Sequence, residues 1–91
     1  MEAVLRTQAR KMISMNCLSM CDVIIEKMGE QVAQEKTDAE TLNMWKMLRE
    51  GFSRIIGLTN LEQTEAVNNS IERILNEMVQ IADLIEVNDP L

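Results

Sequence analysis

Apolar residues in the first third of the chain recur with a helical period, but they occupy two opposite faces. On a wheel of 100° per residue, eight of them fill one broad arc that we expect to face the core. These eight are Ile13, Cys17, Leu18, Met20, Cys21, Ile24, Ile25 and Met28. Five more lie on the other side, namely Val4, Leu5, Met12, Met15 and Val23. A helix with two apolar faces normally buries one in its own domain and the other against a partner. The second set is therefore predicted to be a partner or self-association surface.

The rest of the chain predicts two further helices, each with one apolar face. In the last of them, six apolar residues alternate spacings of four and three, which is the seam of a helical bundle. They are Val67, Ile71, Ile74, Met78, Ile81 and Ile85. A middle helix places five side chains together, namely Trp45, Leu48, Phe52, Ile55 and Ile56. The scarcity of aromatic residues and the single proline also favour helix over strand.

Two four-residue motifs predict where these helices begin. Thr37–Glu40 and Thr59–Glu62 both have the Thr-x-x-Glu form of a capping box, and Gly57 suits a left-handed cap at the end of the middle helix. We therefore expect one domain over residues 1–91, with helices at about 3–34, 38–56 and 60–87 and a frayed C-terminal tail. Gly29 leaves open whether the first helix kinks or ends early.

The fold class that follows is all-α, a three-helix antiparallel arrangement with a long first helix. Short connections make neighbouring helices antiparallel. The first helix would be roughly 48 Å long and the second roughly 28 Å, so the second cannot cover the first from end to end. We expect self-association to complete the fold, most simply as a homodimer, with another protein as a further possible partner.

Charge and hydropathy limit the possible partners and location. The net charge is −6, and residues 58–91 carry seven acidic side chains against Arg73 alone. A surface of this kind is unsuited to nucleic acid, which needs basic contacts. No apolar run is long enough to cross a bilayer, and no secretory signal is evident, so we expect a cytoplasmic protein without a membrane partner.

Carboxylates on the last helix are the main candidate for chemistry. Glu65, Glu72 and Asp83 form an acidic ridge, which could bind a divalent cation or meet a basic surface such as Lys46, Arg49 and Arg54 of another subunit. The pairs Glu62-x-x-Glu65 and Asp83-x-x-Glu86 resemble acidic motifs of the all-α nucleotide pyrophosphohydrolases. Those sites draw their ligands from facing helices, whereas these pairs lie many turns apart on one helix.

Other chemical signatures are weaker. Cys17 and Cys21 could supply thiolates to a zinc site shared between two copies, but both fall in the main apolar arc and are expected to be core residues. The chain has no histidine or tyrosine to activate a nucleophile. The sequence therefore predicts a non-enzymatic protein–protein interaction module without a cofactor, acting as an adaptor, inhibitor or chaperone-like regulator. The alternatives are a metal-dependent nucleotide hydrolase using Glu62, Glu65, Asp83 and Glu86, and a structural subunit of a larger assembly.

Overall fold

The protein is an elongated arrangement of three helices. The computed structural model describes residues 2–35 and 39–88, with side chains up to Ile85. Over these ranges the chain forms α1 (Glu2–Ala33), α2 (Ala39–Thr59) and α3 (Glu65–Asn88), and no strand. The molecule measures 49 × 20 × 19 Å. The prediction of an all-α fold with three helices is confirmed.

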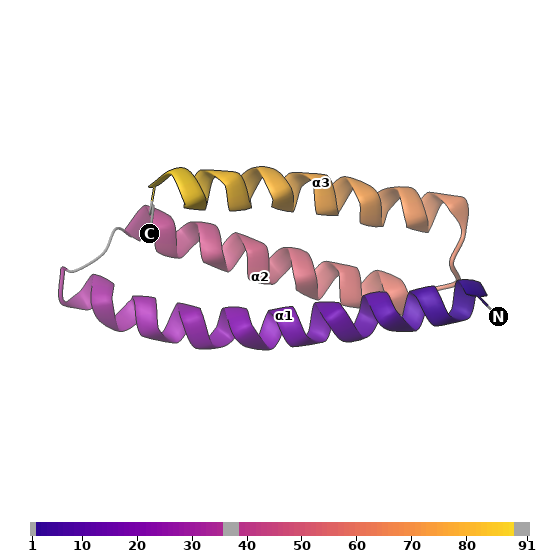
Figure 1. Ribbon diagram of the computed structural model, residues 1–91, viewed down its shortest axis with the longest axis horizontal. Coiled ribbons are helices and arrows are strands. Elements are labelled where there is room, and N and C mark those ends of the chain that lie inside the picture. The colour runs from indigo at the N-terminus through magenta and orange to yellow at the C-terminus, as the bar shows by residue number, and fades with distance from the viewer. Residues whose placement is uncertain (1, 36–38, 89–91) are drawn as a thin grey trace.

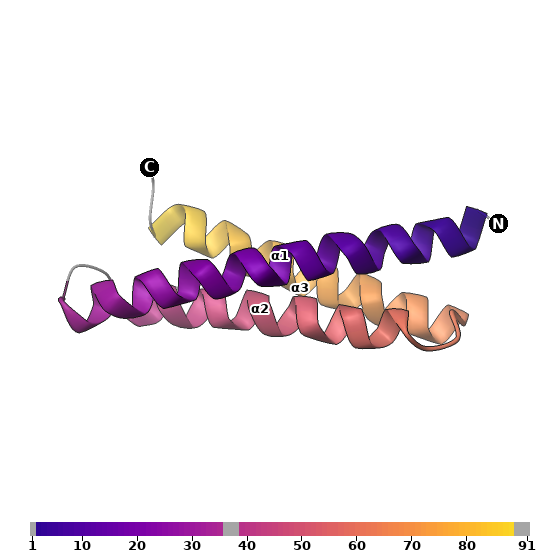
Figure 2. The same cartoon turned by 90° about the horizontal axis from the view of Figure 1, so that it is seen from below.

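The middle helix holds the other two together. Figure 1 shows α2 between α1 and α3, with one connecting segment at each end of the molecule. Among the described residues, α1 and α3 both contact α2, but none of their Cα atoms come within 8 Å of each other. In the perpendicular view of Figure 2, α1 and α3 cross each other and α2 runs along the lower edge of the molecule. The side of α1 and α3 that faces away from α2 is therefore not covered by a helix of the described chain.

The apolar core lies mainly between α2 and α3. Its buried cluster consists of Cys21, Leu48, Ile55, Ile71, Ile74 and Met78. Val67, Ile81 and Ile85 pack against this cluster, so all six residues of the predicted α3 seam lie in the core or at its edge. Removing such side chains from water stabilises the fold by roughly 25 cal/mol per Å². The contribution of α1 to the buried cluster is a single residue, Cys21.

α1 passes through Gly29 without ending there. It stops at Ala33, where the amide of Gln34 donates to the Glu30 carbonyl at 3.1 Å and that of Glu35 to the Val32 carbonyl at 3.0 Å. Glu35 adopts a φ of 58°, the left-handed conformation that ends many helices. The predicted capping box at Thr37–Glu40 lies partly outside the described residues, as does the predicted frayed tail.

The junction between α2 and α3 differs from the prediction. α2 continues through Gly57 to Thr59, and no described glycine has a positive φ. The hydroxyl of Thr59 donates to the Ile56 carbonyl at 2.7 Å, so this side chain is bonded within its own helix. The predicted capping box at Thr59–Glu62 and the left-handed cap at Gly57 are therefore wrong.

α3 begins five residues later than expected, at Glu65. The amide of Val67 donates to the Thr64 hydroxyl at 3.2 Å, which is the bond that an N-cap residue accepts from the third helical amide. Thr64 and not Thr59 therefore starts the helix. None of the described helices combines the length and hydropathy needed to cross a bilayer.

Candidate interaction surface

The five residues predicted to contact a partner are all exposed on α1. Their exposed fractions run from 49% at Met15 to 65% at Met12, and the other members are Val4, Leu5 and Val23. We call these five residues the outer stripe. A surface of this kind on a small protein is a typical feature of interaction sites.

Polar residues occupy the inner face of the N-terminal half of α1, opposite the outer stripe. Ser14 is buried, at 4% exposure. Lys11 Nζ donates to Asn60 Oδ1 at 2.8 Å, and Arg10 Nη1 donates to Asn68 Oδ1 at 3.2 Å. These bonds tie α1 to the α2–α3 junction and to α3. Because hydrogen bonds satisfy the inner side of this half of α1, its apolar residues are left to face outward.

Two residues predicted for the core lie on the surface instead. Ile13 is 62% exposed and Met20 is 64% exposed. Their predicted place in the core is wrong, because the contact of α1 with α2 is narrower than the apolar arc of the sequence. Cys17, Leu18, Ile24 and Ile25 are half-buried, while Cys21 and Met28 are buried, so the remainder of that arc does face the protein.

The exposed apolar surface continues from α1 onto α3. The Arg10–Asn68 hydrogen bond marks the sides on which the two helices face each other. Ile13 and Met20 lie within about 80° of Arg10 on the α1 wheel, and Leu75 and Val79 lie within about 20° of Asn68 on the α3 wheel. Leu75 and Val79 are also exposed. We call these four residues, together with Leu5, Met12 and Val23 of the outer stripe, the open face; Val4 and Met15 lie further round α1, away from Ile13 and Met20.

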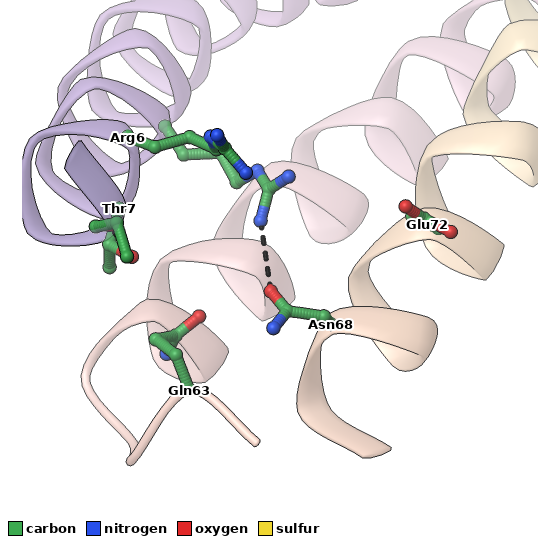
Figure 3. A pocket seen from close by; sticks show the side chains of 7 residues that line it. Arg6, Thr7, Gln63, Asn68 and Glu72 are labelled. Atoms are coloured by element: carbon green, nitrogen blue, oxygen red, sulfur yellow. Dashed lines mark hydrogen bonds between the residues drawn. The ribbon is translucent and has the colours of Figure 1, made fainter. Parts of the chain in front are cut away.

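A polar pocket of about 310 Å³ lies at the end of the open face nearest the N-terminus. It is lined by Ala3, Arg6, Thr7, Arg10, Gln63, Asn68 and Glu72. Figure 3 shows the α1 side chains on one side of this space, with Asn68 and Glu72 of α3 on the other. Two arginines and one glutamate give the pocket a basic α1 wall and an acidic α3 wall.

Gln63 closes the floor of this pocket. Its Nε2 donates to the carbonyls of Leu58, at 2.9 Å, and Leu61, at 2.7 Å, which shapes the chain between α2 and α3. Its Oε1 is buried and accepts no hydrogen bond from the described residues. Buried polar atoms are usually satisfied, and an unsatisfied one costs about 1–3 kcal/mol. The floor of the pocket therefore presents an acceptor suited to a donor group.

The acidic ridge predicted on α3 is exposed. Glu65, Glu72 and Asp83 all lie at the surface, as does Glu62 in the preceding segment. Among the described side chains, no group of three or more histidine, cysteine, aspartate or glutamate residues lies close enough together to hold a metal ion. The fourth residue of the proposed hydrolase set, Glu86, lies beyond the described side chains. The described carboxylates therefore remain a charged surface and form no metal centre among themselves.

The two cysteines occupy different environments. Cys21 is buried in the core cluster and Cys17 is half-buried, both as free thiols. Burial raises the pKa of the Cys21 thiol, and the neighbouring Cys17 and Asp22 act in the same direction, against the smaller opposite effect of Arg49. Cys21 is thus held as a neutral thiol, which suits a core residue and not a reactive or metal-binding one.

Comparisons of this chain with models of protein families, with curated proteins and with solved structures found no match.

Proposed function

We propose that this chain is a small non-enzymatic interaction module of the cytoplasm, an adaptor, inhibitor or chaperone-like regulator that binds through α1. In this proposal its antiparallel three-helix arrangement is completed by self-association, and the outer stripe contacts a second copy or another protein. Two free cysteines, one of them buried, agree with a reducing compartment.

The observation that carries the proposal is the lack of free charge in the middle of α1. Residues 12–25 contain one charged side chain, Asp22, and it forms a salt bridge with Arg49 of α2. Over the same stretch, Met12, Met15 and Val23 are exposed. A helix that is apolar around most of its circumference is typically buried on more than one side. Among the residues that the structure describes, those of α2 and α3 cover α1 on one side only.

The free energy available from this surface is comparable with the cost of forming a dimer. Fully burying an aliphatic or methionine side chain gains about 1.5–3 kcal/mol, so a half-exposed one gains about 1 kcal/mol. Ten such side chains, five from each copy, give roughly 10 kcal/mol against an association cost of about 4–15 kcal/mol. The outer stripe alone is close to the threshold, so further contacts decide the affinity.

The test is the double variant Met12→Glu/Met15→Glu, studied by analytical ultracentrifugation and circular dichroism. We expect it to keep its helix content and to lose self-association or partner binding, because two charges would be placed in an apolar contact. Asn43→Glu/Met47→Glu is the matched control, since it adds the same two charges at exposed positions of α2.

If the Met12/Met15 variant loses helix content while the unmodified protein sediments as a monomer, the outer stripe belongs to the intramolecular core. The proposal would then have no surface to act through. Equal loss of association in the α2 control would also contradict it, because the effect would then come from net charge and not from the outer stripe.

A further inference from the structure

Two rows of exposed side chains with a seven-residue spacing run along the open face, one on α1 and one on α3. On α1 the row is Arg6, Ile13, Met20 and Lys27, and on α3 it is Glu65, Glu72 and Val79, with Asp83 one turn further on. A spacing of seven keeps each row on one side of its helix. Along the α1 row the side chains are basic, apolar, apolar and basic in turn. Along the α3 row they are acidic, acidic, apolar and acidic.

The two rows are level with each other along the molecule. In Figure 1 the colour runs in the same direction along α1 and α3, so their residue numbers increase together. The Arg10–Asn68 hydrogen bond sets their relative height, so each α1 residue is level with the α3 residue about 58 positions later. Arg6 is thus level with Glu65, Met20 with Val79, and Lys27 close to Asp83.

Any molecule that covers the open face must match both rows at once. It has to present an acidic and apolar row to α1 and a basic and apolar row to α3. This chain itself carries both rows, and at three of the four levels, those of Arg6, Met20 and Lys27, the α3 row has an opposite charge or an apolar side chain. An interface that pairs a surface with itself through two-fold symmetry needs this kind of self-complementarity, in which residue i contacts residue j of the partner and the reverse.

We propose that a second copy of the chain covers the open face, related by a two-fold axis parallel to the helices, so that α1 of each copy lies over α3 of the other. This inference rests on the proposed function and adds the orientation and the charge pairing of the dimer. Arg6 and Lys27 of one copy then lie near Glu65 and Asp83 of the other, with Ile13, Met20 and Val79 between them.

The charges exclude the other two-fold arrangement that brings the open faces together. An axis perpendicular to the helices would place α1 on α1 and α3 on α3. The acidic residues of α3, Glu65, Glu72 and Asp83, would then meet their own copies. Like charges facing each other across an interface are unfavourable, whereas opposite charges fix register and partner choice.

The size of the open face fits a stable dimer. Residues 6–27 span about 32 Å, and with the 20 Å width of the molecule they cover roughly 600 Å² on each copy. Specific dimers typically bury about 600–1,000 Å² on each partner. The projected area of the face is thus at the lower end of the range for a specific interface.

The experiment uses two charge-reversal variants and their mixture. One is Arg6→Glu/Lys27→Glu on the α1 row, and the other is Glu65→Lys/Asp83→Lys on the α3 row. Each alone places like charges in the dimer and should raise the dissociation constant by about tenfold or more in sedimentation equilibrium. An equimolar mixture restores opposite charges at both contacts, and we expect its affinity to return to within about threefold of the unmodified protein.

A change in net charge alone would not weaken the association of each variant and restore it in the mixture. The α3 variant brings the net charge from −6 to −2, so a general loss of repulsion would strengthen its association, whereas the row pairing predicts weakening. Lys46→Glu/Arg54→Glu is the matched control for the α1 variant. It makes the same charge change on exposed positions of α2, and we expect it to dimerise normally. Circular dichroism melting checks that every variant is folded.

Three outcomes would overturn the inference. In the first, the unmodified protein is a monomer at all concentrations. In the second, both row variants dimerise normally, and the surface of Met12 and Met15 then remains to be tested as the whole interface. In the third, the α2 control variant dissociates while the α1 variant still dimerises. The acidic ridge of one copy would then contact the basic residues of α2 in the other copy. The proposed function fails separately, when Met12→Glu/Met15→Glu changes neither self-association nor partner binding.

Discussion

Gly51 of α2 lies directly against Met78 of α3, and a methyl group in its place would force the Met78 side chain to move. A Cβ atom at Gly51 would lie 2.5 Å from Met78 Sδ and 2.8 Å from Met78 Cγ, both well inside van der Waals contact. Gly29 and Gly57 are helical as well, but a Cβ atom there would meet nothing within 4 Å. The chain thus contains one glycine with a packing role and two matched controls without one.

The expected magnitudes follow from two opposing effects. Replacing a helical glycine by alanine gains about 0.5–1 kcal/mol, because glycine has more backbone entropy to lose on folding. Gly29→Ala and Gly57→Ala should each raise the unfolding free energy by that amount. At Gly51 the same gain is opposed by overpacking, which costs about 1–3 kcal/mol in a filled core. Gly51→Ala should therefore be less stable than either control variant by about 1–3 kcal/mol.

Urea unfolding followed by circular dichroism measures these differences. A double-mutant cycle with Met78→Ala isolates the contact, because removal of the thioether side chain leaves room for the methyl group. In the Met78→Ala background, Gly51→Ala should become stabilising, like the two control substitutions. The reasoning is refuted if Gly51→Ala stabilises the otherwise unmodified protein as much as Gly29→Ala does.

Two further predictions concern α3 and the core thiol. Ile74→Asp should lower the unfolding free energy by more than about 4 kcal/mol, because it buries an unpaired charge. Glu72→Ala on the surface should change it by about 0.5 kcal/mol or less. If thermal melting shows similar losses of stability for the two variants, the core has been assigned to the wrong face of α3. Because the pKa of the buried Cys21 thiol is raised, its contribution to stability should be complete below the ordinary thiol pKa of about 8.5 and should be lost as the pH rises through the folded-state pKa. The urea midpoint should therefore fall more steeply between pH 7 and 10 in the unmodified protein than in Cys21→Ala. A thiol reagent should also label Cys17 before Cys21. Equal pH slopes or equal labelling rates would contradict the burial of Cys21.

Sequence periodicity predicted the parts of the fold in which one face is apolar and the other polar. The α3 seam is such a case, and residues such as Ile71, Ile74 and Met78 are buried as expected. α1 has no such contrast, because apolar residues lie around most of its circumference. A wheel therefore could not decide between Ile13 and Cys21 as the residue facing the core. The choice depends on the width of the contact with α2, which is a tertiary property.

The helix ends were harder to predict, because several residues offered similar signals. Thr59 and Thr64 both precede a stretch that can form helix, and Thr59 has the better capping-box sequence. The outcome depends on Gln63, whose amide binds the carbonyls of Leu58 and Leu61 and holds the intervening segment out of helix. The sequence did not by itself single out Val79 as exposed. Val79 follows the exposed Glu72 by seven residues, and this spacing would have placed both on the same side of α3.

The unequal share of the helices in the core has a consequence for the order in which the molecule opens. α2 and α3 supply every member of the buried cluster except Cys21, so these two helices should show the slowest amide hydrogen exchange. The N-terminal half of α1 has polar contacts on its inner side, such as Lys11 with Asn60, and its amides should exchange faster by local opening, while buried Cys21 and Met28 hold the C-terminal half on the protein. The half of α1 that carries most of the outer stripe is then also the part that opens first. A bound partner would slow exchange chiefly in α1, and unoccupied α1 would be the segment that proteases and aggregating chains reach first.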